Sequence, residues 1–190
     1  FPLDSSDLSQ INFYVPTYMT GAKGLSYVAQ MTNLKTLQMP NAGYEDALAH
    51  LRPGLTLCNA AGVHDASTAE LAVGLAIASR RGFAEFMKEQ KEEVWNHRRF
   101  PALSDSKVGI VGFGSIGKEI ARKLSVFDVE ITAFTQSGRD GSHKVEELDV
   151  RVVNPYKFNG CGLVISSDVI KAGVNIPKSI MLVHEDTAFQ

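Results

Sequence analysis

Three glycines in the second half of the chain are spaced as in a phosphate-binding turn. Gly112, Gly114 and Gly117 follow the order G-x-G-x-x-G directly after a short apolar run. In such a turn the first glycine permits a tight reversal, the second admits a pyrophosphate to the backbone, and the third lets a helix pack closely on its strand. The pattern predicts a dinucleotide site, with Ser115 and Ile116 opening a helix whose unpaired N–H groups face the anion.

A glycine-rich turn that binds nothing is the alternative, and the flanking segments favour the dinucleotide site over it. Residues 107–111 have the apolar character of a strand buried on both faces. Apolar residues then recur at helical spacing as far as Leu124, and a second apolar run, Val129–Phe134, arrives at the separation typical of a βαβ unit. We therefore predict a strand, a turn and a helix here.

Composition indicates a small-molecule-binding protein. The 190 residues are 44% hydrophobic, enough for a core, and carry a formal net charge of −2. This charge favours neither nucleic acid nor an anionic membrane as a partner, and no apolar run has the length of a membrane span. Cys58 and Cys161 define no disulfide framework or metal site. We expect a soluble cytoplasmic protein without a metal.

The first sixty residues alternate between strand and helix patterns. Strands are expected at 11–15, 34–39 and 55–58. Between them we expect a loop at 21–24 that leads into a short helix at 25–31, and one or two helical turns at 45–51. This alternation predicts an α/β fold with a small parallel sheet.

The clearest helix start is Ser67–Glu70, a capping box with a hydroxyl at the cap and a carboxylate three residues later. The following residues are apolar on nearly every side as far as Ala78, which predicts burial between domains or subunits. From Glu85 to Glu93 the pattern is charged and indicates a solvated helix face. We place one unit at 1–64, a connecting helix and linker at 65–106, and a second unit at 107–190.

The order of these motifs resembles the D-isomer-specific 2-hydroxyacid dehydrogenases. Asn41–Gly43 follows one strand, Asn59–Gly62 follows another, Ser67–Glu70 opens a long helix, and Gly112–Gly117 comes next. The resemblance covers residues 11–148. It implies a flavodoxin-like substrate domain at 1–64 and a Rossmann-type parallel sheet at 107–190, both incomplete, and hydride transfer between NAD(P) and a 2-keto or 2-hydroxy acid.

The resemblance also implies roles for two other parts of the chain. The backbone N–H groups of Asn41, Ala42 and Gly43 would hold the substrate carboxylate, because a turn of small residues forms an anion-binding concavity. An ordinary turn is the alternative at this position. The helix at 67–81 would pack two copies of the chain into a homodimer.

Cofactor choice depends on the end of the second Rossmann strand. An acidic residue there normally binds the adenosine ribose of NAD. This chain has Thr135 and Arg139 instead, which suit the 2′-phosphate of NADP through charge-assisted hydrogen bonds. NADP is therefore favoured over NAD, and Asp140 is the residue most able to reverse that preference.

The family pattern fails near the end of the sequence, where Arg, Glu and His would polarise and protonate the substrate carbonyl. No Arg follows Arg151, and His184 and Glu185 are adjacent, so on a strand they would point to opposite faces. Residues 150–160 also fit the family poorly, and within them Pro155 and Asn159–Gly160 indicate turns. We expect a chain truncated at its catalytic end and impaired in activity, with no catalytic residue assigned. The alternative is a non-catalytic dinucleotide-binding or dimerisation module.

Overall fold

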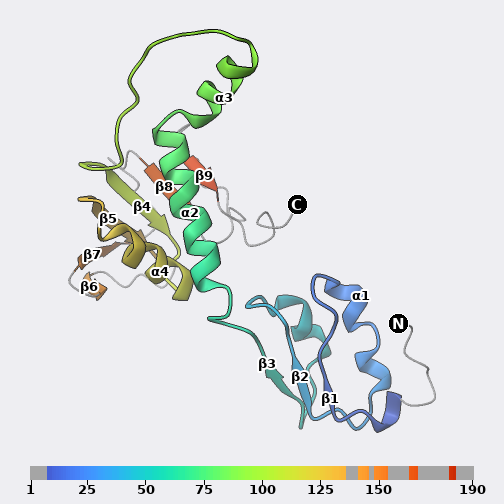
Figure 1. Ribbon diagram of the computed structural model, residues 1–190. Coiled ribbons are helices and arrows are strands. Elements are labelled where there is room, and N and C mark those ends of the chain that lie inside the picture. The colour runs from blue at the N-terminus through green and yellow to red at the C-terminus, as the bar shows by residue number, and fades with distance from the viewer. Residues whose placement is uncertain (1–7, 136–140, 146–147, 154–162, 167–179, 183–190) are drawn as a thin grey trace. The chain divides into compact units, whose positions relative to one another are not determined.

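The computed structural model describes residues 8–135, 141–145, 148–153, 163–166 and 180–182. The chain forms two compact units, Phe1–His64 and Asp65–Gln190 (Figure 1). Each unit has its own hydrophobic core and its own parallel sheet. The helix that was expected to act as a connector belongs to the second unit.

The first unit is a small three-stranded parallel sheet with strand order β1-β2-β3. Its elements, in chain order, are η1 (Leu8–Gln10), β1 (Phe13–Tyr14), α1 (Gly21–Leu25), η2 (Val28–Gln30), β2 (Thr36–Gln38), η3 (Glu45–His50) and β3 (Thr56–Cys58). The predicted strands and their parallel arrangement are confirmed. Residues 21–24, which were predicted to be a loop, instead form α1 with Leu25. The helices expected at 25–31 and 45–51 are mainly 3₁₀, a geometry that is common in short connecting pieces.

Leu25, Val28 and Met31 are fully buried in the core of this unit, on the predicted apolar side of the connection. Two polar side chains hold the connection in place. The Tyr14 hydroxyl donates to the Gly24 carbonyl at 2.7 Å, and burial raises the pKa of Tyr14. The Arg52 guanidinium donates to the carbonyls of Val28 and Met31, which satisfies backbone acceptors at the end of η2.

The second unit is a six-stranded sheet with strand order β6-β7-β5-β4-β8-β9, parallel throughout except at the β6 edge. Its elements are α2 (Asp65–Arg80), α3 (Phe83–Lys91), β4 (Lys107–Val111), α4 (Ser115–Leu124), β5 (Glu130–Phe134), β6 (Gly141–Val145), β7 (Leu148–Val153), β8 (Leu163–Ser166) and β9 (Ile180–Leu182). The predicted Rossmann-type arrangement is confirmed, with β4 in the interior of the sheet between β5 and β8.

The turns predicted at Pro155 and Asn159–Gly160 lie outside the described residues, whereas residues 150–153, for which no strand was predicted, belong to a strand. Strand β7 runs to Val153 and pairs in parallel with β5, in the register Ala133 opposite Val152. Strand β6 pairs antiparallel with β7, so the two strands form a hairpin at the edge of the sheet. Along β7, Asp149 and Arg151 alternate with apolar residues, a two-residue period typical of a strand that the sequence analysis did not recognise.

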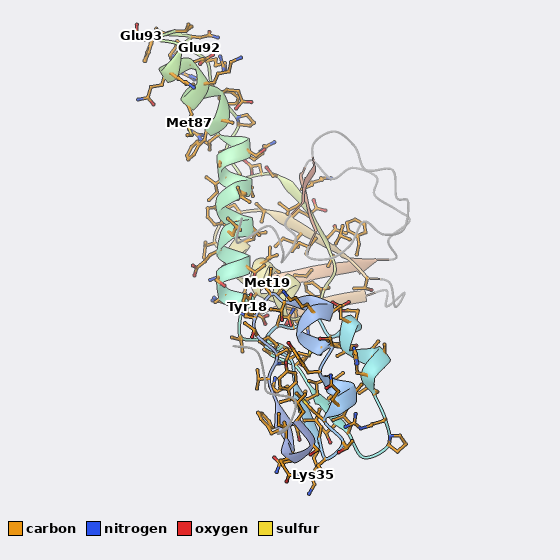
Figure 2. All side chains as sticks on the ribbon, turned by 90° about the vertical axis from the view of Figure 1, so that its right-hand side faces the viewer. Tyr18, Met19, Lys35, Met87, Glu92 and Glu93 are labelled. Atoms are coloured by element: carbon orange, nitrogen blue, oxygen red, sulfur yellow. The ribbon has the colours of Figure 1, made fainter. Side chains whose placement is uncertain are left out.

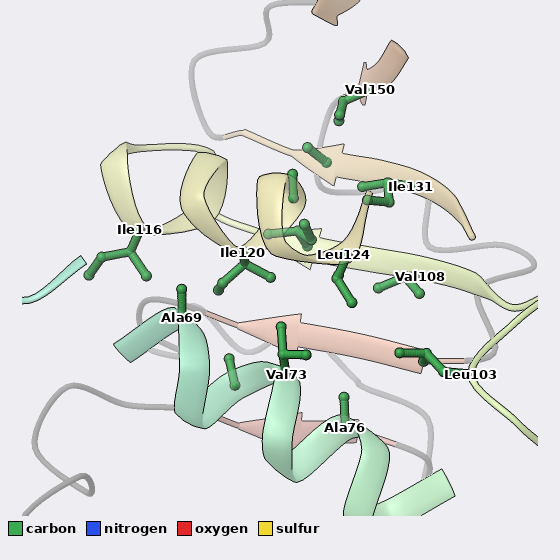
Figure 3. Packing of buried hydrophobic residues seen from close by; sticks show 14 residues of the cluster. Ala69, Val73, Ala76, Leu103, Val108, Ile116, Ile120, Leu124, Ile131 and Val150 are labelled. Carbon is green, nitrogen blue, oxygen red and sulfur yellow. The ribbon is translucent and has the colours of Figure 1, made fainter. Parts of the chain in front are cut away.

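Helices α2 and α4 pack side by side and share the main core of the second unit (Figure 3). Helix α4 contributes Ile116, Ile120 and Leu124, which recur every four residues along its buried face. Helix α2 contributes mostly small residues, namely Ala69, Ala72, Val73 and Ala76. Small side chains let two helix axes approach closely. The N-terminal ends of the two helices also meet, since the Ser115 hydroxyl donates to Asp65 Oδ1 at 3.2 Å.

Helix α2 begins at Asp65, so Ser67 lies inside the helix and the prediction that it caps the helix was wrong. The sequence predicted burial of this helix between domains or subunits, and within the second unit one face of the helix is buried. Ala69 and Ala72 are fully buried, whereas Leu71 and Leu75 keep 37% and 38% of their surface exposed. Within this unit the helix therefore has a buried face against α4 and an exposed apolar face.

Helix α3 has no buried residue, as its charged sequence predicted. Figure 2 shows its side chains, Met87 among them, projecting away from the helix. The loop that follows folds back on it, since the Phe86 and Phe100 rings meet edge to face at 5.2 Å and Arg98 forms an ion pair with Glu89. Among the described residues, no helix is long and apolar enough to cross a membrane.

One exposed ion-pair cluster on α4 predicts how stability responds to acid. Arg122 donates to Glu119 through Nε at 2.8 Å and Nη2 at 2.7 Å, and these bonds, with Lys123 nearby, lower the pKa of Glu119 from 4.5 to about 2. The stabilisation is complete above the ordinary pKa and is lost as the pH falls from 4.5 towards 2. Because the cluster is at the surface, we expect Glu119→Gln to cost less than about 1 kcal/mol at neutral pH.

The free energy of unfolding in urea, measured across this pH range, would test that expectation. The difference in the free energy of unfolding between wild type and Glu119→Gln should decrease as the pH falls. Glu130→Gln is the matched control, because Glu130 lies 3.8 Å from Lys107 with both side chains exposed. A difference in the free energy of unfolding that stays constant down to the lowest pH would show that the Glu119 ion pairs do not stabilise the fold.

Candidate functional site

The turn between β4 and α4 is held by the glycines that were singled out from the sequence. Gly112 adopts a φ of 89°, in the left-handed region that favours glycine, and its N–H donates to the Phe134 carbonyl at 2.9 Å. This bond ties the turn to the end of β5. The chain then enters α4 through Gly114, whose backbone is extended and which provides no side-chain cap.

Gly117 makes the closest backbone approach in this turn. A β-carbon built on it would lie 2.1 Å from the Gly112 carbonyl oxygen and 3.5 Å from Cγ2 of Ile110. Any residue with a side chain at this position would therefore push the first turn of α4 away from β4. Glycine at this position lets the helix start immediately beside the end of its strand.

Gly114 is the opposite case, because a β-carbon built on it would meet nothing within 4 Å. The space over the turn is open on the side where the N–H groups of the first helical turn lack a side-chain cap. Ser115 is exposed there, while the side chain of Ile116 lies in the core, so only the backbone of Ile116 can face a ligand. This combination of open space and uncapped N–H groups suits an anion.

The turn follows β4, the strand at which the order of strands in the sheet changes direction. Strand β4 pairs with β5 on one side and with β8 on the other, and Val111 is the last residue of β4. In open parallel sheets, ligands bind outside the carboxyl ends of the strands at this switch point. The position of Gly112–Gly117 in the fold is thus the usual position of a nucleotide site.

Thr135 follows β5 at the same end of the sheet. Its Oγ1 is buried and has no hydrogen-bond partner among the described residues. A buried hydroxyl without a partner is costly, so a ligand or water that bonded to it would be favoured. Arg139 and Asp140, which bear on the choice between NADP and NAD, lie outside the described residues.

The loop Asn41–Gly43, after β2 in the first unit, is half-buried. Its carbonyls are held by the loop that follows β3, because Asn59 Nδ2 donates to the Ala42 carbonyl at 2.8 Å and the Ala60 N–H donates to the Asn41 carbonyl at 2.9 Å. Its three N–H groups donate to no other described residue. The Asn41 Oδ1 atom is also buried without a partner in the described part of the chain.

Two carboxylates that the sequence analysis did not single out lie beside these loops. Glu45 Oε2 accepts the Tyr44 N–H at 3.0 Å and would lie 3.3 Å from a β-carbon on Gly43. Asp65 Oδ1 accepts a hydrogen bond from the Ser115 hydroxyl at 3.2 Å. Glu45 and Asp65 could have been singled out in the sequence, because acidic residues are favoured near helix starts. Nothing in the sequence indicated that Asp65 would contact Ser115, which lies 50 positions away.

Neither a metal centre nor a histidine-based site emerges from the described residues. They contain no cluster of three or more His, Cys, Asp or Glu that could hold a metal ion. His64, at the end of the first unit, contacts the Tyr18 ring at a centroid distance of 5.8 Å. His184 and Glu185 lie outside the described residues, and so do most of residues 154–179.

A family profile matches just over half of the chain. Residues 73–170 match the D-isomer specific 2-hydroxyacid dehydrogenase, NAD binding domain. A hydroxypyruvate reductase of Thermotoga maritima is 30% identical over 122 residues, which are 62% of this chain and 40% of that protein. The chain spans less than half the length of the first curated relatives that it matches.

Solved structures share the fold. A D-isomer specific 2-hydroxyacid dehydrogenase family protein from Aeromonas salmonicida superimposes with a TM-score of 0.70 at 20% identity, over 86% of this chain and 52% of that one. An NADPH-dependent glyoxylate/hydroxypyruvate reductase from Sinorhizobium meliloti, in complex with NADP and sulfate, gives a TM-score of 0.65 at 18% identity, over 85% of this chain and 50% of that one.

Gly114, which precedes α4, and Gly117, in its first turn, should differ in how strongly an added methyl group destabilises the protein. Gly117→Ala places a β-carbon against backbone, so we expect a loss of about 2–4 kcal/mol in the free energy of unfolding. Gly114→Ala enters open space and should cost no more than about 1 kcal/mol, the difference between Gly and Ala at a helix N-cap. Urea unfolding of both variants measures this contrast. Equal losses would show that the close approach of Gly117 to Gly112 is not maintained in solution.

Proposed function

Because the chain belongs to the D-isomer specific 2-hydroxyacid dehydrogenase family, we propose that its second unit binds a nicotinamide dinucleotide over the turn Gly112–Gly117. We propose further that the whole protein transfers a hydride between NAD(P) and a small 2-keto or 2-hydroxy acid. The observation that carries the proposal is the open space over Gly114 beside uncapped N–H groups, at the switch point of the sheet.

In this proposal the backbone supplies most of the binding. The N–H groups of Ser115, Ile116 and Gly117 donate to the pyrophosphate, aided by the positive end of α4. The buried Thr135 hydroxyl gains a partner in the adenosine ribose or its 2′-phosphate. NADP is favoured over NAD because Arg139 can form charge-assisted bonds with a 2′-phosphate and no acidic residue stands at the end of β5.

The first unit supplies the proposed site for the substrate carboxylate. The three N–H groups of Asn41, Ala42 and Gly43 have no acceptor among the described residues, and Asn59 braces the loop through the Ala42 carbonyl. Small side chains leave these groups accessible to a carboxylate. The bound nicotinamide supplies the hydride chemistry, and we assign no residue of this chain to proton transfer.

Cofactor titration of purified protein tests the dinucleotide site. We expect NADPH and NADH to bind, with NADPH the tighter ligand, and Arg139→Ala to remove that difference. Gly114→Ala should weaken both cofactors by about tenfold or more, since its methyl group occupies the space of the pyrophosphate while leaving the fold intact. Fluorescence or calorimetry gives the dissociation constants, and circular dichroism confirms folding.

The same titration can reject the proposal. If neither cofactor binds the folded wild-type chain at millimolar concentration, the turn is a packing element only. If Gly114→Ala binds as tightly as wild type, the ligand does not lie over Gly114.

We propose that the exposed apolar face of α2 forms a homodimer. Leu71 and Leu75 lie one turn apart on this face, and both are more than a third exposed in the single chain. A twofold axis beside the helix would bring the same two residues of a second copy against them. Burial of four leucine side chains in this way would contribute a few kcal/mol, at about 25 cal/mol per Å² of apolar surface.

Sedimentation of the doubly substituted chain tests this interface. Wild type should sediment as a dimer, and Leu71→Glu with Leu75→Glu as a monomer, because the carboxylates would be buried without partners. Met87→Glu is the control, since Met87 on α3 is 70% exposed and lies outside the α2 face. A monomeric wild type, or a control that dissociates as readily, would exclude this face.

A further inference from the structure

The carboxylate of Asp65 lies where the N-terminal ends of two helices meet. Asp65 is the first residue of α2, and Ser115 is the first residue of α4. The Ser115 hydroxyl donates to Asp65 Oδ1 at 3.2 Å. Below this contact, Ala69 and Ile116 belong to one core cluster and lie near each other in Figure 3, so the packing of α2 on α4 holds the pair together.

Helix N-termini attract anions, because the uncapped N–H groups and the aligned peptide dipoles carry partial positive charge. Here one anionic group of the protein already lies at that place. The proposed pyrophosphate would bring further negative charge to the first turn of α4, within a few residues of Ser115. Like charges at such separations repel, and the repulsion is stronger where the local dielectric is low.

Ser115 strengthens the conflict. A serine hydroxyl has one hydrogen to donate, and this hydrogen is directed at Asp65. While that bond persists, Ser115 Oγ can offer a phosphate oxygen only its lone pairs. The carboxylate therefore opposes the ligand through its charge and also engages the nearest side-chain donor.

We propose that Asp65 is a determinant of cofactor affinity, which weakens dinucleotide binding by placing a negative charge at the rim of the pyrophosphate site. This inference rests on the proposed function of the Gly112–Gly117 turn. The charge acts on the pyrophosphate, a part common to NADH and NADPH, so it lowers the affinity for both and leaves the preference between them unchanged.

Dissociation constants of NADH and NADPH for Asp65→Asn test the proposal. The amide has the shape of the carboxylate without its charge, and Asn is as good as Asp near a helix start. We expect both cofactors to bind about tenfold more tightly at low ionic strength, and the gain to shrink as salt screens the charge. The gain should persist in a Ser115→Ala background, because it arises from charge. Asp65→Ser provides a second neutral variant should Asp65→Asn fold poorly.

Asp128→Asn is the matched control, since it makes the same change in net charge. Asp128 lies just before β5, at the amino-terminal edge of the sheet, away from the start of α4. Its cofactor affinities should equal those of wild type.

The outcomes separate this inference from the proposed function. Binding by wild type with unchanged or weaker binding by both neutral Asp65 variants overturns the role of Asp65 and leaves the dinucleotide site standing. A gain that disappears in the Ser115→Ala background, or that Asp128→Asn reproduces, also overturns it. Failure of every folded variant to bind either cofactor overturns the proposed function and this inference together.

Discussion

The second unit is organised by the contact between Gly112 and Gly117. A β-carbon at Gly117 would lie 2.1 Å from the Gly112 carbonyl oxygen, so the first turn of α4 lies directly against the end of β4. With the helix in that place, its N–H groups are at the carboxyl edge of the sheet and Ile116 points into the core. A larger residue at Gly117 would displace both the helix and the donors that an anion needs.

Helix α2 packs against α4 in this position. Because α2 presents mainly alanines to α4, the two helices pack closely along Ala69, Ala72 and Ala76. The starting ends of the two helices also lie together, where the Ser115 hydroxyl donates to Asp65. Further along, Lys123 of α4 forms an ion pair with Glu70 of α2 at 3.3 Å, which links the two helices a second time. The same ammonium group lies 3.4 Å from Glu119 of its own helix.

The two candidate anion loops share a physical design despite their different units. Each follows a parallel strand and uses small residues to expose backbone N–H groups. Each also has a carboxylate of the protein close by, Glu45 at the Asn41–Gly43 loop and Asp65 at the Gly112–Gly117 turn. Charge balance at such loops depends on side chains outside the motif, so a motif alone does not define affinity.

Local sequence accounts for the strand, turn and helix at residues 107–124. Their apolar period and glycine spacing are properties of neighbouring residues, which a linear sequence displays directly. Strand β7 was not predicted, although Asp149 and Arg151 alternate with apolar residues along it at the two-residue period of a strand, and the sheet pairs it on both sides. The start of α2 was likewise misplaced, since Ser67–Glu70 has the residue types of a cap inside a helix that begins at Asp65.

The sequence by itself thus determined the Rossmann-type unit, its glycine turn and the family to which the chain belongs. Only the tertiary structure decided which face of α2 is buried, that Thr135 keeps a buried hydroxyl without a partner in the described residues, and that Asp65 meets Ser115. The physical reason is the range of the interactions. Helix and turn preferences act within a few residues, whereas burial and electrostatic contacts depend on packing between segments that are distant along the chain.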